Sequence, residues 1–154
     1  DLFQSQLYTQ EARANKPYTY FPDINGQFII RSLEGNSSDT EADYSRVHFS
    51  LASKELADKN VYVYGAFNNF ETSKENKMTF NSKEGVYKSN FKLKQGFYNY
   101  TFATKNHAGL LNLYEINGSH YQTENEYTVL VYYRPFGALY DRVIGVGTGF
   151  FNQQ

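Results

Sequence analysis

Three histidines, His48, His107 and His120, are the side chains of this sequence best suited to bind a metal ion or to transfer protons. A metal site needs several donor groups that converge on one point. The chain contains no cysteine, and His120 with Glu124 and Glu126 is the nearest approach to a ligand cluster. We therefore interpret these residues as surface histidines and expect no metal and no cofactor.

Other patterns that carry chemistry are incomplete. Asp23, Asn25 and Gly26 resemble the start of a calcium loop, but the later oxygen ligands and the terminal glutamate are missing, so a turn explains them better. Glu124 and Glu126 fall on one side of an expected strand, where two carboxylates could do acid–base chemistry or simply face solvent. No Gly-x-Ser-x-Gly sequence is present. We predict that the protein is not an enzyme and has no small-molecule substrate.

Aromatic rings are the remaining candidates for function, because the chain has 15 Tyr and 13 Phe. Exposed rings on a sheet can stack on sugars or anchor a protein partner, provided that no charges lie between them. The alternative is that most of these rings fill the core, since the interior of a β-sandwich needs that volume.

Alternation of apolar and polar residues predicts the strands that must position these rings. In the segment 86–94, four residues fall on one face: Tyr87, Ser89, Phe91 and Leu93. Tyr98, Tyr100 and Phe102 repeat the pattern. The segment 126–133 is apolar on both faces and is therefore expected inside a sandwich.

Two Asn-Gly pairs predict turns. Asn25-Gly26 lies between two aromatic or β-branched runs and predicts a hairpin, because both residues tolerate positive φ. Asn117-Gly118 is expected to close a short strand over residues 113–116. With about seven to nine short antiparallel strands, the pattern is typical of an all-β, immunoglobulin-like sandwich.

Length and charge bound the remaining possibilities. A chain of 154 residues favours one domain with a sizeable core. We expect a connecting arm over residues 1–16 and the sandwich over residues 17–154. The net charge of −1 excludes a large field for nucleic acid or an anionic membrane. The apolar run 129–133 is far shorter than the ~20 residues that cross a bilayer, so no direct membrane insertion is expected.

The motifs GAFNNF (65–70) and EGVYKSNFKLKQGFYNYTF (84–102) resemble the early-set immunoglobulin-like domains that include glycogen-binding modules. The matching residues are Gly65, Phe67, Asn68, Leu93, Gly96, Tyr98 and Tyr100. Phe70 stands where those modules have a sugar-stacking tryptophan. This resemblance implies, as one alternative, a carbohydrate-binding module that uses Phe67, Asn68, Phe70 and Tyr87.

A second resemblance covers nearly the whole chain. PDINGQF, EADYSRVHFSL, LKQGFYNY and TENEYTVLVYYRP look like the C-terminal domain of the type IX secretion system plug protein family. The resemblance implies a non-enzymatic periplasmic protein that takes part in protein transport. Its implied partner is the outer-membrane barrel of the type IX translocon, which the plug occludes when the barrel is unoccupied.

Residues that could contact such a partner lie at the end of the last long apolar run and directly after it. Tyr132, Arg134, Pro135 and Phe136 combine aromatic and arginine side chains, the types that dominate binding hot spots, with an expected projecting loop. The alternative is that they end a strand and turn a corner.

Overall fold

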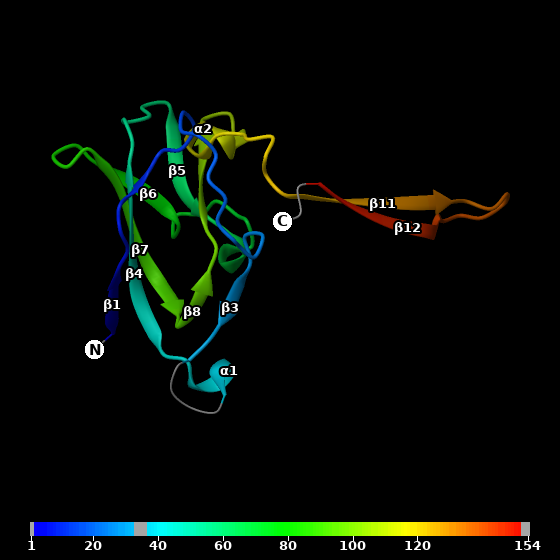
Figure 1. The fold of residues 1–154 in the computed structure, drawn as a ribbon, viewed down its shortest axis with the longest axis horizontal. Helices are drawn as coiled ribbons and strands as arrows, with labels where there is room; N and C mark the ends of the chain where they lie inside the picture. Colours follow the sequence, from blue (N-terminus) through cyan, green and yellow to red (C-terminus); the bar gives the residue numbers. More distant parts are fainter. Residues whose placement is uncertain (1, 33–36, 152–154) are drawn as a thin grey trace. The chain divides into compact units, whose positions relative to one another are not determined.

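The computed structural model describes residues 2–32 and 37–151 of the chain. It divides into two compact units, one ending at Ser119 and one beginning at His120 (Figure 1). In chain order, its elements are β1 (Phe3–Gln6), β2 (Gln10–Glu11), β3 (Phe28–Ile30), α1 (Ser38–Glu41), β4 (Tyr44–Ala52), β5 (Lys59–Tyr64), the 3-10 helix η1 (Ala66–Asn68), β6 (Lys77–Asn81), β7 (Val86–Lys94), β8 (Gly96–Tyr98), β9 (Thr101–Asn106), β10 (Leu111–Asn112), α2 (Tyr114–Asn117), β11 (Asn125–Tyr133) and β12 (Arg142–Phe151).

The first unit is an all-β sandwich, which confirms the predicted fold class. Its main pairing path runs β1-β4-β7-β6-β5-β9-β10, and β3 pairs with β8. Strand β6 pairs with β5 through residues 77–78 and with β7 through residues 79–81. It therefore changes layers part-way along its length and joins the β4–β7 layer to the β5–β9 layer.

The core lies between these layers, where the inward residues of each strand meet. In β4 and β7 the register places Leu51 opposite Tyr87. The face predicted for residues 86–94 is confirmed, because Tyr87 is buried and Phe91 and Leu93 are half-buried, whereas Lys92 is exposed. The buried cluster comprises Phe49, Leu51, Val61, Val63, Met78, Tyr87, Phe102 and Ile116.

The first residues of the chain form strands of this sheet, which differs from the connecting arm expected over residues 1–16. Both β1 and β2 pair in parallel with β4, in register Phe3 with Ser45 and Gln10 with Leu51. Leu7 also packs against the buried cluster. The weakly helical spacing of apolar residues in this segment gave no sign of the pairing, because its partner lies some forty residues later in the chain.

The Asn25-Gly26 turn is confirmed, but the hairpin expected around it is wrong. Asn25 and Gly26 have φ angles of 54° and 74°. Strand β3, which follows the turn, pairs with β8, in register Phe28 with Tyr98. The segment before the turn forms no strand pair with β3. It is held by a side-chain hydrogen bond, in which the Ile24 N–H donates to Asn99 Oδ1.

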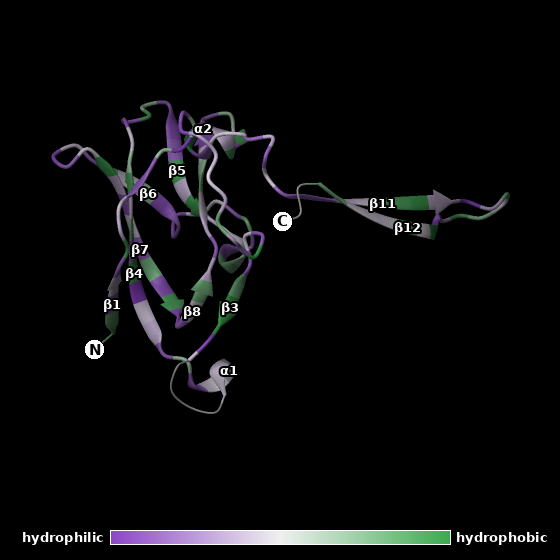
Figure 2. Cartoon of the chain, viewed as in Figure 1, coloured by the Kyte–Doolittle hydropathy of each residue, from purple (hydrophilic) through white to green (hydrophobic). Residues whose placement is uncertain are grey.

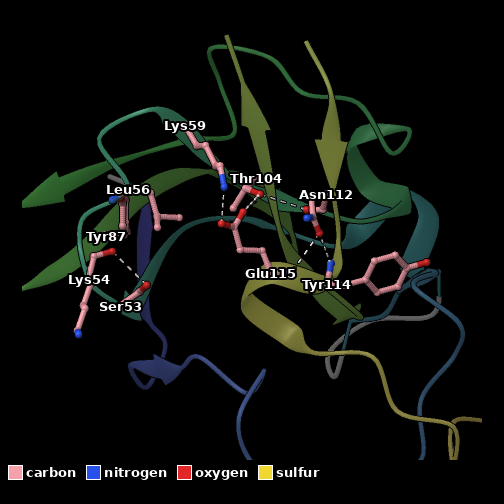
Figure 3. Close-up of polar contacts among 9 residues, drawn as sticks. All are labelled: Ser53, Lys54, Leu56, Lys59, Tyr87, Thr104, Asn112, Tyr114 and Glu115. Atoms are coloured by element: carbon pink, nitrogen blue, oxygen red, sulfur yellow. Dashed lines mark hydrogen bonds and ion pairs between the residues drawn. The ribbon is translucent and has the colours of Figure 1, made fainter. Parts of the chain in front are cut away.

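Residues 114–117 form the helical turn α2, so the strand expected over residues 113–116 is wrong. Asn112 Oδ1 accepts hydrogen bonds from the N–H groups of Tyr114 and Glu115, at 2.8 and 3.0 Å (Figure 3). These bonds satisfy donors that have no partner inside a first helical turn. Ile116 is 3% exposed and belongs to the core, so one apolar anchor fixes this turn.

The second unit contains a long antiparallel hairpin, β11 paired with β12. The strand predicted over residues 126–133 is confirmed, but its expected place inside the sandwich is wrong, because all nine residues of β11 are exposed. Figure 2 shows hydrophobic residues in the middle of this strand. The chain therefore divides near residue 119, rather than into an arm and a single sandwich over residues 17–154.

Candidate interaction hairpin

The hairpin presents two different apolar faces, because successive side chains of a strand point to opposite sides. On one face, here called the glycine face, Tyr127 lies opposite Gly149, Val129 opposite Gly147 and Val131 opposite Gly145. On the other, here called the aliphatic face, Leu130 lies opposite Val146 and Tyr132 opposite Val143. Valine and tyrosine favour extended backbone, which is why these residues form strands.

The glycine face carries a strip without side chains beside Tyr127, Val129 and Val131. A Cβ atom added at Gly147 or at Gly149 would meet no heavy atom within 4 Å. The apolar side chains of β11 are therefore uncovered along the side that faces β12. A partner side chain could pack into that strip.

A register shift separates the two ends of the hairpin. It lies between Val131 and Tyr132 on β11, where Gly145 and Val143 are the paired residues of β12. Ile144 is the extra residue of this β-bulge and is exposed. The bulge places one more aliphatic side chain at the surface close to Tyr132.

A two-point ion pair closes the end of the strands. Arg134 donates from Nε and Nη2 to the two carboxylate oxygens of Asp141, at 2.8 and 3.0 Å. This hydrogen bonding raises the pKa of Arg134 above its ordinary value. Both side chains are about half exposed, and the paired geometry fixes the base of the loop between them.

The loop itself is a short turn with an aromatic residue at its end. The Ala138 N–H donates to Pro135 O at 3.0 Å, and Gly137 has a φ of 81°, a conformation that favours glycine. Phe136 is fully exposed. The turn therefore holds a large apolar ring in solvent.

The hairpin as a whole exposes more apolar surface than a two-stranded sheet can stabilise by itself. Val129 is 62% exposed on the glycine face and Leu130 is 47% exposed on the aliphatic face. Isolated two-stranded hairpins are marginally stable in water, and large exposed apolar patches mark interaction sites. The two faces and the turn are therefore the candidate interaction surface.

The four predicted partner-binding residues lie together at the turn end of this hairpin. Tyr132 is on the aliphatic face, and Arg134, Pro135 and Phe136 lead into the loop. Sequence analysis expected a strand here but named no residue of β12 as a candidate contact, notably not Val143, Ile144 or Val146. The signal that could have found them is the alternation of glycine with valine and threonine in residues 145–149, which matches a strand that pairs with β11.

The predicted carbohydrate-binding residues are not brought together as a stacking surface. Phe67 is half-buried, and its ring stacks on that of Phe91 with centroids 5.9 Å apart. Tyr87 is 4% exposed and lies in the core. Its hydroxyl accepts a hydrogen bond from the Leu56 N–H at 2.7 Å (Figure 3). These two rings are structural.

Asn68 is also structural. Its side chain accepts from the Gly65 N–H at 3.2 Å and donates to Val63 O at 2.9 Å, which holds the loop after β5. Phe70 differs, because its ring is 42% exposed and its φ of 55° is unusual for a bulky residue. It lines a surface pocket of about 350 Å³ whose other residues are Asp23, Asn25, Gly26, Tyr64, Gly65, Asn99, Tyr100 and Thr101.

The described part of the chain contains neither a cluster of metal ligands nor a helix that could span a membrane. No group of three or more His, Asp or Glu side chains in residues 2–32 and 37–151 is placed to hold a metal ion. Within the same residues, no helix has the length and hydropathy to cross a membrane.

Among known proteins, the chain is similar to a protein whose structure has been solved. No family model and no curated protein matches the chain. The chain is similar to the crystal structure of a hypothetical protein from Parabacteroides merdae, with a TM-score of 0.83 and 41% sequence identity. The likeness covers 96% of this chain and 38% of that protein, so this chain spans less than half the length of the protein it matches. A solved protein structure thus contains the same all-β sandwich fold.

Proposed function

We propose that this chain is a non-enzymatic protein-interaction domain of a periplasmic plug, with an early-set immunoglobulin-like sandwich. In this proposal its β11–β12 hairpin contacts the outer-membrane barrel of the type IX translocon and contributes to closing the unoccupied barrel. The observation that carries the proposal is that the hairpin presents apolar side chains on both faces and that all of β11 and all of β12 except Gly145 are exposed. The sequence resemblance to the plug family supports the identity of the partner.

The residues of the hairpin define the kind of protein surface that would fit it. Within the two strands, Glu126 and Arg142 are the charged side chains among the residues described. Apart from the pair Thr128 and Thr148, the side chains between them are aliphatic or aromatic, and such side chains bind best to an uncharged surface that excludes water. Phe136 and Tyr132 are the residue types that most often anchor such contacts.

The proposal can be tested by recovering the barrel from secreting cells with the tagged full-length protein. Val129→Lys places a charge on the glycine face, and Leu130→Lys places one on the aliphatic face. We expect each to reduce recovery of the barrel by about tenfold, because a buried unpaired charge is costly. Thr19→Lys, at an exposed position in the first unit, is the matched control and should leave recovery unchanged.

Two results would contradict the proposal. One is failure to recover the unoccupied barrel with the unmodified protein. The other is equal recovery with all three lysine variants while their melting temperatures remain the same. Binding of the hairpin to another domain of a longer chain would appear as loss of stability of that chain in the Val129 and Leu130 variants, with barrel recovery unaffected.

A carbohydrate-binding function is the second candidate, and one observation favours it. Phe70 is exposed at a pocket that also contains Tyr64, Asp23 and Asn99, so an apolar ring and several polar groups face one space. Aromatic rings and amide or carboxylate groups are suited to the two faces of a sugar. This arrangement differs from the predicted set, since it keeps Phe70 and excludes Phe67, Asn68 and Tyr87.

Calorimetric titration with soluble α- and β-glucans tests this candidate directly. Heat on binding that is lost in Phe70→Ala and kept in Phe97→Ala would support it, because Phe97 is an exposed ring outside the pocket. Absence of heat with both classes of glucan would remove it.

A further inference from the structure

The strands β1, β4, β6 and β7 carry positive charge without negative charge. Together they contain five lysine or arginine residues and no aspartate or glutamate. The whole chain has a net charge of −1, so its acidic residues lie elsewhere. Three of the five, Arg46, Lys88 and Lys92, are exposed on the side of β4 and β7 that faces away from the core.

The centre of this basic face is a pair of like charges. Arg46 on β4 lies directly opposite Lys92 on β7, and both side chains are exposed. Like charges in such a cross-strand pair destabilise a sheet. Among the residues described, neither side chain takes part in an ion pair within 4.0 Å. The free protein therefore carries a repulsion that an anionic partner would relieve.

Neighbouring side chains hold these cations in place. Arg46 Nη1 donates a hydrogen bond to Asn90 Oδ1 at 2.9 Å. The guanidinium group has further N–H donors that a partner could use. The ammonium groups of Lys92 and Lys94 lie 4.5 and 5.7 Å from the centroid of the Tyr44 ring. A ring face attracts cations and limits their motion. The two lysine charges are thereby gathered around one aromatic ring.

Other polar side chains border the cations on the same face. His48 lies opposite Asn90, and its Nε2 is 2.8 Å from Gln4 Oε1 on β1. Further along β7, Lys88 is paired with Glu84 at 2.6 Å. The unpaired charge is therefore confined to a short patch that crosses from Arg46 to Lys92, beside amide groups that can bind a peptide backbone.

We propose that this basic face binds an acidic segment of a protein partner, with Arg46 and Lys92 pairing with its carboxylates. A planar guanidinium favours two-point binding of a carboxylate. The small size of the patch and the negative charge of the whole chain favour a few carboxylates over an extended polyanion or an anionic membrane. This inference uses other strands than the hairpin, so it stands whether or not the hairpin binds the barrel.

Fluorescence anisotropy with a labelled oligo-glutamate peptide of about ten residues tests the proposal. We expect binding by the unmodified chain at low salt, a loss of about five- to tenfold in affinity for Arg46→Gln or Lys92→Gln, and a larger loss in the double variant. The double variant Lys54→Gln with Lys74→Gln removes two exposed lysines outside these strands. It is matched in net charge and should change affinity by less than about twofold.

Stability gives a second and independent measurement. Because each Gln substitution removes the repulsion between Arg46 and Lys92, the melting temperature should stay the same or rise, so lost binding cannot be attributed to unfolding. Equal loss of peptide binding in the two double variants would overturn the proposal. Absence of peptide binding would also overturn it, as would binding to vesicles with about a third phosphatidylglycerol in preference to the peptide.

Discussion

Lys59 Nζ donates a hydrogen bond to Glu115 Oε1 at 2.6 Å, which links β5 to α2 (Figure 3). The second carboxylate oxygen accepts from Thr104 Oγ1, also at 2.6 Å. The hydrogen bond with Lys59, followed by that with Thr104, lowers the pKa of Glu115 below its usual 4.5. The hydrogen bond with Glu115 is also the main cause of a raised pKa for Lys59. This network fixes the turn that carries Ile116 into the core.

Glu115 should make stability depend on pH under acidic conditions. Because its pKa is lowered in the folded state, its contribution is complete above about 4.5 and is lost as the pH falls through the folded-state value. We expect Glu115→Gln to lower the free energy of unfolding by about 1 kcal/mol at pH 7 and to weaken the acid dependence. Urea unfolding from pH 7 to pH 3 measures both effects. Glu55→Gln, at an exposed site, should keep the unmodified pH dependence, and identical curves for the two variants would contradict this role.

Tyr87 should contribute through its hydroxyl as well as its ring. Tyr87→Phe keeps the buried ring but leaves the Leu56 N–H without its 2.7 Å acceptor, so we expect a loss of about 1 kcal/mol. Tyr87→Ala also opens a cavity and should cost about 3–5 kcal/mol. Denaturant unfolding measures both losses. Tyr8→Phe, at a position 91% exposed, is the control and should change stability little. Equal losses in Tyr87→Phe and Tyr8→Phe would contradict a stabilising role for the Tyr87 hydroxyl.

Asn76 should be essential for the loop before β6. It is buried, donates to Val63 O and Glu71 O at 2.9 and 2.8 Å, and accepts from the Ser73 N–H at 2.7 Å. In Asn76→Asp both donors are lost and a carboxylate faces two carbonyl oxygens, so we expect a loss of about 2–3 kcal/mol at pH 7. Thermal unfolding measures the loss. Asn15→Asp makes the same chemical change at an exposed site and should be nearly neutral.

Gly96 should be required for pairing of β3 with β8. A Cβ atom at this position would lie 2.4 Å from Ile29 O, which is backbone and cannot move without displacing β3. We expect Gly96→Ala to destabilise the protein by about 1–3 kcal/mol and to speed hydrogen exchange in residues 28–30. Gly147→Ala is the control, since the space around Gly147 is open within 4 Å. Unchanged exchange in Gly96→Ala would contradict the prediction.

Local patterns in the sequence predict the strands of the sandwich well. In β7, alternation over nine residues identifies the inward face that contains Tyr87 and Phe91, because period two and one-sided burial produce the same signal. The Asn25-Gly26 turn is also predictable, since positive φ is a property of these two residues. The strand face and the turn are both determined by residues that lie close together in the sequence.

Features that depend on remote partners are not predictable in this way. The pairing of Phe3 with Ser45 involves residues far apart in the chain, and nothing in the first sixteen residues specifies it. The apolar character of Val129 and Leu130 shows that both faces of β11 avoid water, but not whether this chain or another protein covers them. For the same reason Tyr132 and Phe136 could be proposed as contacts, whereas the residues of β12 were missed.

The position of β1 and β2 beside β4 has a consequence for self-association. These two short segments occupy the outer backbone groups of a nine-residue strand. Bare borders of this kind recruit strands from other molecules and start aggregates. A chain that begins after Pro17 would uncover that border, and it should oligomerise or precipitate at concentrations where the longer chain remains dispersed. By pairing with β4, the N-terminal segment is therefore expected to prevent this strand from pairing with strands of other molecules.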